Sequence, residues 1–256
     1  MLVGTRVSVD GVAIDPLTEL DVVTTVCGAL DRGEGGRILT PNVDILRLAR
    51  ADPAVRQYLA DATIVVADGM PVVWASRLAG TPLPERVPGS GLIWSLSYHL
   101  GRSGRSVYLI GGVPEDGARR AAAVLAAACP GLRIAGARSP AYGFEHDSES
   151  LAELCAGVVE AKPDLVFVGL GFPKQERLID ALRPELPMSW FIGCGAAIDF
   201  VAGDRPRAPQ WMQRSGLEWL WRLAGDPRRL AGRYLRHDAP YAVRLLTRAA
   251  LRRVRR

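Results

Sequence analysis

Short, almost wholly apolar runs alternate along this chain with longer stretches of helical pattern, and this alternation limits the possible folds more than any other feature. Nearly continuous apolar runs are typical of parallel strands that are covered on both faces. Strands that alternate with helices of this length favour an open, doubly wound parallel sheet with helices on both faces. We therefore expect an α/β fold. The predicted strands are residues 37–40, 63–67, 107–110, 165–168 and 190–192.

Three helices can be placed between those strands. The first follows Asp15-Pro16, a pair that supplies a capping side chain and a proline suited to a first helical turn. The second runs from about Pro114 to Ala128, and Pro130-Gly131 ends it. The third spans about Asp147 to Ala161.

Glycine, asparagine and aspartate follow each predicted strand. In open α/β sheets, ligands bind beyond the carboxyl ends of the strands. Glycine and asparagine also serve ordinary turns, so a single loop of this kind has a simple structural explanation. Five such loops in succession favour a ligand site. The five strand exits are Thr40-Pro41-Asn42, Asp68-Gly69, Gly111-Gly112, Gly169-Leu170-Gly171 and Gly193-Cys194-Gly195.

The formal charge of the chain is divided very unevenly. Residues 205–256 hold 14 Arg, no Lys and three acids, which gives +11; the whole chain carries +5, so residues 1–204 carry −6. An acidic body with a strongly basic tail predicts an anionic partner. The proline-punctuated junction from Arg205 to Pro209 marks the boundary. We predict a catalytic domain of residues 1–204 and a helical, Arg-rich appendage of residues 205–256.

The end of the appendage has an amphipathic helical pattern from Pro240 to Arg256. One side of the predicted helix carries Arg244, Arg248, Arg252, Arg255 and Arg256, and the other carries Val243, Leu246, Ala250, Leu251 and Val254. Such a helix can lie on an anionic membrane surface. Alternatively, it packs on the body of the protein and leaves the arginines in water.

Cysteine usage and apolar runs exclude several classes of protein. The cysteines (Cys27, Cys129, Cys155 and Cys194) are scattered without a CxxC pair, as expected for free thiols in a reducing compartment. The N-terminus lacks the apolar core of a secretory signal. The longest stretch without a charged side chain, Val87 to Gly101, has 15 residues, fewer than the roughly 18 of a spanning helix. We expect a cytoplasmic protein that meets a bilayer only from its surface.

Asp68 is the strongest candidate for a general base. It follows an apolar strand and precedes Gly69, so its carboxylate is expected in a partly desolvated crevice. Desolvation raises a carboxyl pKa and favours removal of a proton from a hydroxyl group. The alternative is that Asp68 caps the helix near Pro71. Thr40 and Asn42 offer a hydroxyl and an amide at the neighbouring strand end, although Asn42 is equally suited to a plain helix cap.

The loops are also suited to binding phosphate. Gly111-Gly112, before a helix, lets backbone amides approach a phosphate closely, but it is not a GxGxxG dinucleotide motif. The loop at Gly169 lacks the Walker pattern, because Gln175 follows Lys174. Asp-x-Asp pairs and clustered histidines are absent, so we expect no metal and no cofactor. The charge of a bound diphosphate would then be met by amides, helix N-termini and arginines such as Arg86.

An ordered set of motifs resembles the WecG/TagA/CpsF family of bacterial glycosyltransferases (glycosyltransferase family 26) from roughly Val7 to Tyr234. The motifs are Thr40-Pro41-Asn42, Ala67-Asp68-Gly69, Gly169-Leu170-Gly171-x-Pro173-Lys174-Gln175-Glu176, Gly193-x-Gly195-Ala196-x-Ile198-Asp199-Phe200, Arg207-Ala208-Pro209-x-Trp211 and Gly216-Leu217-Glu218-Trp219-Leu220. The resemblance implies a Rossmann-like fold and an inverting, metal-independent transfer. The sugar would be of the N-acetylmannosamine type or its uronic acid, and it would pass from UDP to a polyprenyl-diphosphate-linked acceptor in cell-surface polymer synthesis.

The resemblance also implies roles for individual residues. It places the catalytic base on Asp68, with Thr40 and Asn42 as further catalytic-site groups. The substrate-binding residues that we predict are Arg86, Gly111, Gly112, Gly169, Gly171, Gln175, Arg222, Arg229 and Arg233, the last three from the appendage that closes over the site at the inner face of the membrane. One departure is Gly91, where the family commonly has Asp, and it could alter donor choice or activity.

Two other functions remain open from the sequence. A nucleotide-binding oxidoreductase could use the same fold, although the dinucleotide motif is missing. A non-enzymatic protein could bind an anionic surface through its arginine tail. We expect no nucleic acid partner, because the −6 body would repel a long polyanion. The sequence leaves homo-oligomerisation open.

Overall fold

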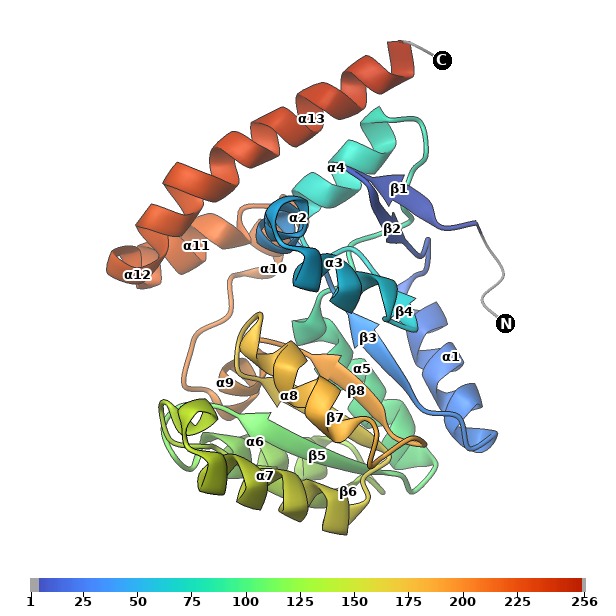
Figure 1. Ribbon diagram of the computed structural model, residues 1–256, viewed down its shortest axis with the longest axis vertical. Coiled ribbons are helices and arrows are strands. Elements are labelled where there is room, and N and C mark those ends of the chain that lie inside the picture. Colours follow the sequence, from blue (N-terminus) through green and yellow to red (C-terminus); the bar gives the residue numbers. More distant parts are fainter. Residues whose placement is uncertain (1–4, 255–256) are drawn as a thin grey trace.

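The computed structural model describes residues 5–254, except for the side chains of Arg214, Arg229 and Val254. Within this range six parallel strands form one sheet, which confirms the predicted α/β fold (Figure 1). The strand order is β4-β3-β8-β7-β5-β6. The strands are β3 (Gly36–Leu39), β4 (Ile64–Val65), β5 (Ser106–Gly111), β6 (Arg133–Arg138), β7 (Leu165–Gly169) and β8 (Trp190–Gly193).

The sequence did not predict β6 or an N-terminal hairpin. Among the described strands β6 pairs with β5 alone, at the edge of the sheet. Its residues are half-buried or exposed rather than continuously apolar. The hairpin joins β1 (Val7–Val9) to β2 (Val12–Ile14) in antiparallel pairing. Its turn places Asp10 and Gly11 at φ of 48° and 89°, in the left-handed region.

Helices cover both faces of the sheet. Alternate residues of each strand point to opposite faces, and because every residue of β3 and β8 is buried, both faces are covered there. On β3, Ile38 packs into a core with α1 (Glu19–Asp31), α5 (Gly89–Arg102), α6 (Gly117–Ala128) and α9 (Ala197–Ala202). The next residue, Leu39, packs into a second core with α2 (Val43–Ala51), α3 (Pro53–Ala60) and α4 (Met70–Leu78). A third core joins Val166 and Val168 of β7 to α7 (Ser148–Ala161) and α8 (Lys174–Leu182).

The three predicted helices are present, but two begin later than predicted, and α6 starts at Gly117 rather than near Pro114. Helix α1 begins at Glu19, and its cap is Thr18 rather than Asp15, because Thr18 and Asp21 form a reciprocal capping box. The Asp15 carboxylate is buried and instead accepts the backbone N–H of Val65, 2.7 Å away, in the edge strand β4.

The C-terminal segment forms α10 (Gln210–Arg214), α11 (Glu218–Gly225), α12 (Pro227–Ala231), the π-helical segment η2 (Gly232–Asp238) and α13 (Ala239–Val254). It passes over the body, and α13 lies along α4 (Figure 1). The predicted amphipathic helix is therefore present, but its buried side differs from the expected one. Tyr241, Leu245 and Ala249 join the core beside α4, whereas Val243 and Leu251 are exposed.

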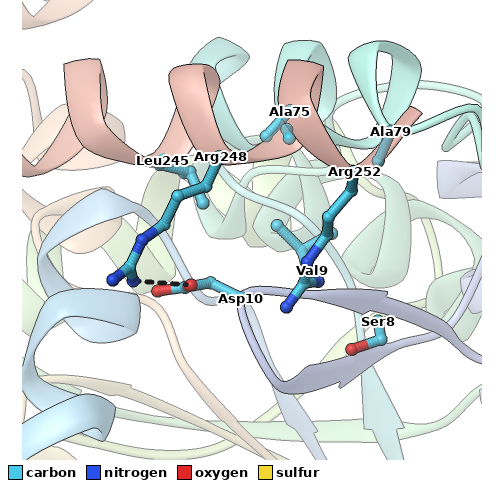
Figure 2. A pocket seen from close by; sticks show the side chains of 9 residues that line it. Ser8, Val9, Asp10, Ala75, Ala79, Leu245, Arg248 and Arg252 are labelled. Atoms are coloured by element: carbon cyan, nitrogen blue, oxygen red, sulfur yellow. Dashed lines mark ion pairs between the residues drawn. The ribbon is translucent and has the colours of Figure 1, made fainter. Parts of the chain in front are cut away.

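An acidic residue of the hairpin anchors this basic helix to the body. The Asp10 carboxylate accepts the Tyr241 hydroxyl at 2.7 Å and a guanidinium N–H of Arg50 at 3.1 Å. Arg248 lies 3.7 Å from the same carboxylate, beneath α13 (Figure 2). Only about 10 Å³ of cavity remains between α13, α4 and the hairpin, so the contact is tightly packed. Part of the basic tail is thus neutralised by the acidic body.

No helix within residues 5–254 has the length and apolar character that crossing a bilayer requires.

Candidate active site

A cleft of about 600 Å³ opens at the carboxyl ends of β3, β4, β7 and β8. Four strand-exit loops form its floor, because these strands are neighbours or near neighbours in the sheet. Trp221, Arg222, Arg233 and Tyr234 of the C-terminal segment also line it. The cleft therefore has walls from both parts of the chain.

Most of the predicted site residues meet in this cleft. Those that line it are Thr40, Asn42, Asp68, Gly169, Gly171, Gln175, Arg222 and Arg233. Arg86 is not one of the lining residues, but its Nη1 lies 3.9 Å from the Asp68 Oδ1. The side chain of Arg229 lies outside the described part of the structure, so its predicted role stays a prediction.

The structure does not bring Gly111 and Gly112 to the cleft. Gly111 is the last residue of β5 and Gly112 follows it, and neither lines the cleft. β7 and β8 separate β5 from β3. A Cβ on Gly111 would lie 2.5 Å from the Gly169 carbonyl oxygen, and one on Gly112, where φ is 86°, would lie 3.0 Å from the Ala118 nitrogen. These glycines serve close backbone packing, and nearby amides already have protein partners: Ala118 donates to Ser139 and Val113 donates to Asp199.

The two helix-cap alternatives have opposite outcomes. Helix α4 is preceded by Gly69 and has no side-chain cap, so Asp68 does not cap it. Asn42 does cap α2, because its Oδ1 accepts the backbone N–H of Ile45 at 3.1 Å. Asn42 also lines the cleft, so it is both the cap of α2 and a site residue.

Asp68 is held at the cleft by charged groups of both signs. Burial raises the pKa of its carboxyl above the ordinary value, and the nearby guanidinium groups of Arg86, Arg222 and Arg207 lower it. Glu218 raises it further. The side chain keeps 27% of its surface exposed, so a substrate hydroxyl could reach it from the cleft. This environment suits a carboxylate that accepts a proton.

Glu218 and Arg207 belong to this charge cluster, and the sequence did not predict a role for either. Glu218 accepts hydrogen bonds from Arg86 at 2.8 Å and from Arg222 at 2.5 Å. The Nε atoms of Arg207 and Arg222 are buried without a hydrogen-bond partner among the described residues. Unpaired buried donors are costly, so an anion that bound them would be favoured. Arg207 and Glu218 lie in motifs that the family shares, Arg207-Ala208-Pro209 and Gly216-Leu217-Glu218-Trp219.

Gln175 is fixed at the floor of the cleft by its neighbours. Its Oε1 accepts the Gly195 N–H at 3.2 Å, and its Nε2 donates to the Glu176 Oε1 at 3.1 Å. A Cβ on Gly193 would lie only 2.1 Å from that Nε2, which explains the glycine at the end of β8. Glu176 in turn forms a buried ion pair with Arg37 at 2.6 Å. The orientation of the Gln175 amide therefore depends on charges beneath the cleft.

The unusual Gly91 lies beside Glu19. A Cβ at this position would be 2.8 Å from the Glu19 Oε2. An aspartate there would bring two carboxylates together, so the Glu19 side chain in this chain disfavours the acid that the family commonly has at this position.

The cleft offers few groups for other chemistry. Among residues 5–254 no cluster of three or more His, Cys, Asp or Glu side chains could hold a metal ion. Cys194 lines the cleft, but burial raises the pKa of its thiol to about 12, so it stays protonated near neutral pH. Asp68 is therefore better placed than Cys194 to act on a substrate hydroxyl.

Comparison with known proteins identifies the family of the chain. Residues 7–256 match the model of the "Glycosyl transferase WecG/TagA/CpsF family". Two relatives named N-acetylglucosaminyldiphosphoundecaprenol N-acetyl-beta-D-mannosaminyltransferase come from Bacillus spizizenii and Staphylococcus aureus. The first is 33% identical over 200 residues (78% of this chain and 75% of the relative). The second is 29% identical over 231 residues (88% and 87%). The chain therefore belongs to the WecG/TagA/CpsF family of glycosyltransferases.

Proposed function

We propose that this enzyme transfers an N-acetylmannosamine-type sugar, or its uronic acid, from UDP to a polyprenyl-diphosphate-linked N-acetylglucosamine in cell-surface polymer synthesis. The observation that carries the proposal is the cleft in which Asp68 faces a cluster of arginines. The names of the relatives support the sugar and the acceptor.

In the proposed reaction Asp68 accepts the proton of an acceptor hydroxyl. The hydroxyl oxygen then forms a bond to the anomeric carbon from the face opposite UDP. The bond from that carbon to the UDP oxygen breaks, and UDP leaves with the bonding electron pair. A single displacement of this kind inverts the anomeric centre. General-base assistance is worth about 10²–10⁴ in rate.

Guanidinium groups would stabilise the negative charge that develops on the departing diphosphate. Arg222 and Arg233 line the cleft, and the buried Nε–H of Arg222 has no hydrogen-bond partner within the described part of the chain. Hydrogen bonds between guanidinium and phosphate are among the strong ones in proteins. We therefore propose a transfer that needs no added metal ion, with Thr40, Asn42 and Gln175 holding the sugar and the nucleotide.

A transfer assay tests this function. Purified protein is incubated with UDP-N-acetylmannosamine and a short-lipid diphosphate acceptor that bears N-acetylglucosamine. We expect UDP release and a disaccharide product only when both substrates are present, with an equal rate in EDTA and in Mg²⁺. UDP-N-acetylglucosamine and UDP-glucose are the control donors. Loss of activity in EDTA would refute metal independence. Binding of NAD(P) with no turnover of any UDP-sugar would favour the oxidoreductase instead.

We further propose that the C-terminal segment lies on the inner face of the membrane, where the lipid-linked acceptor is anchored. Exposed apolar side chains stand near exposed arginines along this segment. They are Val243 and Leu251 on α13, and Arg228, Arg236, Arg244, Arg252 and Arg253. A basic residue near an anionic membrane surface contributes about 1 kcal/mol to binding.

Vesicle flotation at low salt tests membrane docking in the full chain. Changing Arg236, Arg244 and Arg253 to Gln is expected to weaken binding to phosphatidylglycerol vesicles by about 3 kcal/mol, or roughly 100-fold. The matched control changes three exposed arginines of the body, Arg102, Arg119 and Arg177, to Gln. Equal losses in the two variants would mean that net charge, rather than this segment, attracts the protein to the membrane.

A further inference from the structure

Glu218 places a second carboxylate next to the proposed base. It is the first residue of α11, it is 8% exposed, and it comes from the C-terminal segment, whereas Asp68 follows β4. Its two carboxylate oxygens bind different arginines, Oε2 to Arg86 and Oε1 to Arg222. Glu218 is therefore held in one position by the same cationic groups that surround Asp68.

Arg86 is shared unequally between the two carboxylates. Its Nη1 is 2.8 Å from the Glu218 Oε2 and 3.9 Å from the Asp68 Oδ1. At 3.9 Å the guanidinium is too far for a hydrogen bond to Asp68. A carboxylate that is hydrogen-bonded to an arginine is a weak base, because the charged form is stabilised.

We propose that Glu218 is a positioning residue that draws Arg86 away from Asp68 and so keeps the Asp68 carboxylate free to accept a proton. This inference rests on the proposed role of Asp68 as the base. Glu218 belongs to α11, so in this proposal the C-terminal segment supplies the carboxylate that engages Arg86.

The charged groups that face Asp68 determine the sign of the effect. They are Arg86, Arg207 and Arg222, which lower the pKa of Asp68, and Glu218, which raises it. Removing the charge of Glu218 leaves only the arginines and releases Arg86 to bind Asp68. Both changes lower the pKa of Asp68, so the base becomes weaker and stays ionised to lower pH.

The test compares Glu218→Gln with the wild-type enzyme, with UDP-N-acetylmannosamine and the short-lipid acceptor as substrates. The acid limb of the kcat profile is expected to move to lower pH, and the kcat plateau to fall about 3–10-fold, because efficiency follows basicity. Glu218→Asp keeps the charge and should restore the wild-type position of the acid limb. Glu85→Gln is the matched control. Glu85 is the residue before Arg86, but its carboxylate accepts the backbone N–H of Glu19 instead of binding Arg86.

A second measurement does not depend on turnover. Titration of the Asp68 carboxyl by ¹³C NMR should give a lower pKa in Glu218→Gln than in the wild type. An unchanged Asp68 titration, together with an unchanged acid limb, would overturn the positioning role even if Asp68→Asn is inactive. An Asp68→Asn variant with normal turnover would instead overturn the base assignment, and the positioning role with it.

Discussion

Replacing Asp68 by asparagine is expected to lower kcat by about 10²–10⁴-fold, because the amide cannot accept the proton of the acceptor hydroxyl. Affinity for UDP should be equal or higher, since the change removes a negative charge beside Arg86 and Arg222. Single-turnover transfer and calorimetric titration with UDP measure the two quantities separately. A large loss of kcat with retained UDP binding is the result that supports Asp68 as the base.

The pH dependence of the wild-type enzyme gives a second measure of the same group. Burial raises the pKa of Asp68, so the active, deprotonated form is lost as the pH falls through a value above the ordinary aspartate range. The acid limb of kcat/KM should therefore lie above that range. Asp61→Asn, a change of an exposed residue that ends α3, is the control and should leave rate and pH profile unchanged. Near-normal turnover in Asp68→Asn would rule out Asp68 as the general base.

The position of the site could be predicted because the carboxyl ends of parallel strands all lie on the same side of the sheet. Thr40, Asp68 and Gly169 lie at or just beyond the carboxyl ends of different strands, and they line one cleft in the structure. The order of the strands could not be predicted, since pairing depends on contacts between distant segments. For this reason Gly111-Gly112 looked equivalent to the other exits, although β5 lies beyond β7 in the sheet.

The basic tail has a more internal role than its composition suggested. Arg205 pairs with Asp199 at 3.1 Å, and Arg248 and Arg233 each lie 3.7 Å from acids of the body, Asp10 and Asp44 respectively. The contacts of Arg248 and Arg233 join segments that are far apart in the sequence, and net charge cannot reveal them. The charge imbalance therefore serves both to fasten the segment over the cleft and, in our proposal, to bind the membrane.

The buried pair Arg37–Glu176 could not be predicted either. Arg37 lies in a strand, 139 residues from Glu176, and an arginine in a strand ordinarily indicates a solvent-facing position. Here the side chain is fully buried and reaches α8 beneath the cleft. It also stacks over the Tyr58 ring, at 5.2 Å from the ring centre, and pairs with Asp180 at 2.7 Å.

Changing Arg37 to methionine is expected to lower the free energy of unfolding by about 3–5 kcal/mol, because it leaves the buried Glu176 carboxylate without its partner. Urea denaturation measures this loss. The double variant Arg37→Met with Glu176→Gln removes both charges and should recover most of it. Asp180→Asn is the matched control, because Asp180 is 46% exposed and such pairs are worth at most about 1 kcal/mol.

The sign of the pH effect separates this explanation from a simple packing defect. Burial already raises the pKa of Glu176 in the folded protein, and Arg37 opposes that rise. Without Arg37 the folded-state pKa rises further above the unfolded value, so the penalty develops as the pH increases and the carboxyl must ionise. The deficit of Arg37→Met should therefore be smaller at pH 5 than at pH 8. A pH-independent deficit that the double variant does not repair would instead indicate lost packing against Tyr58.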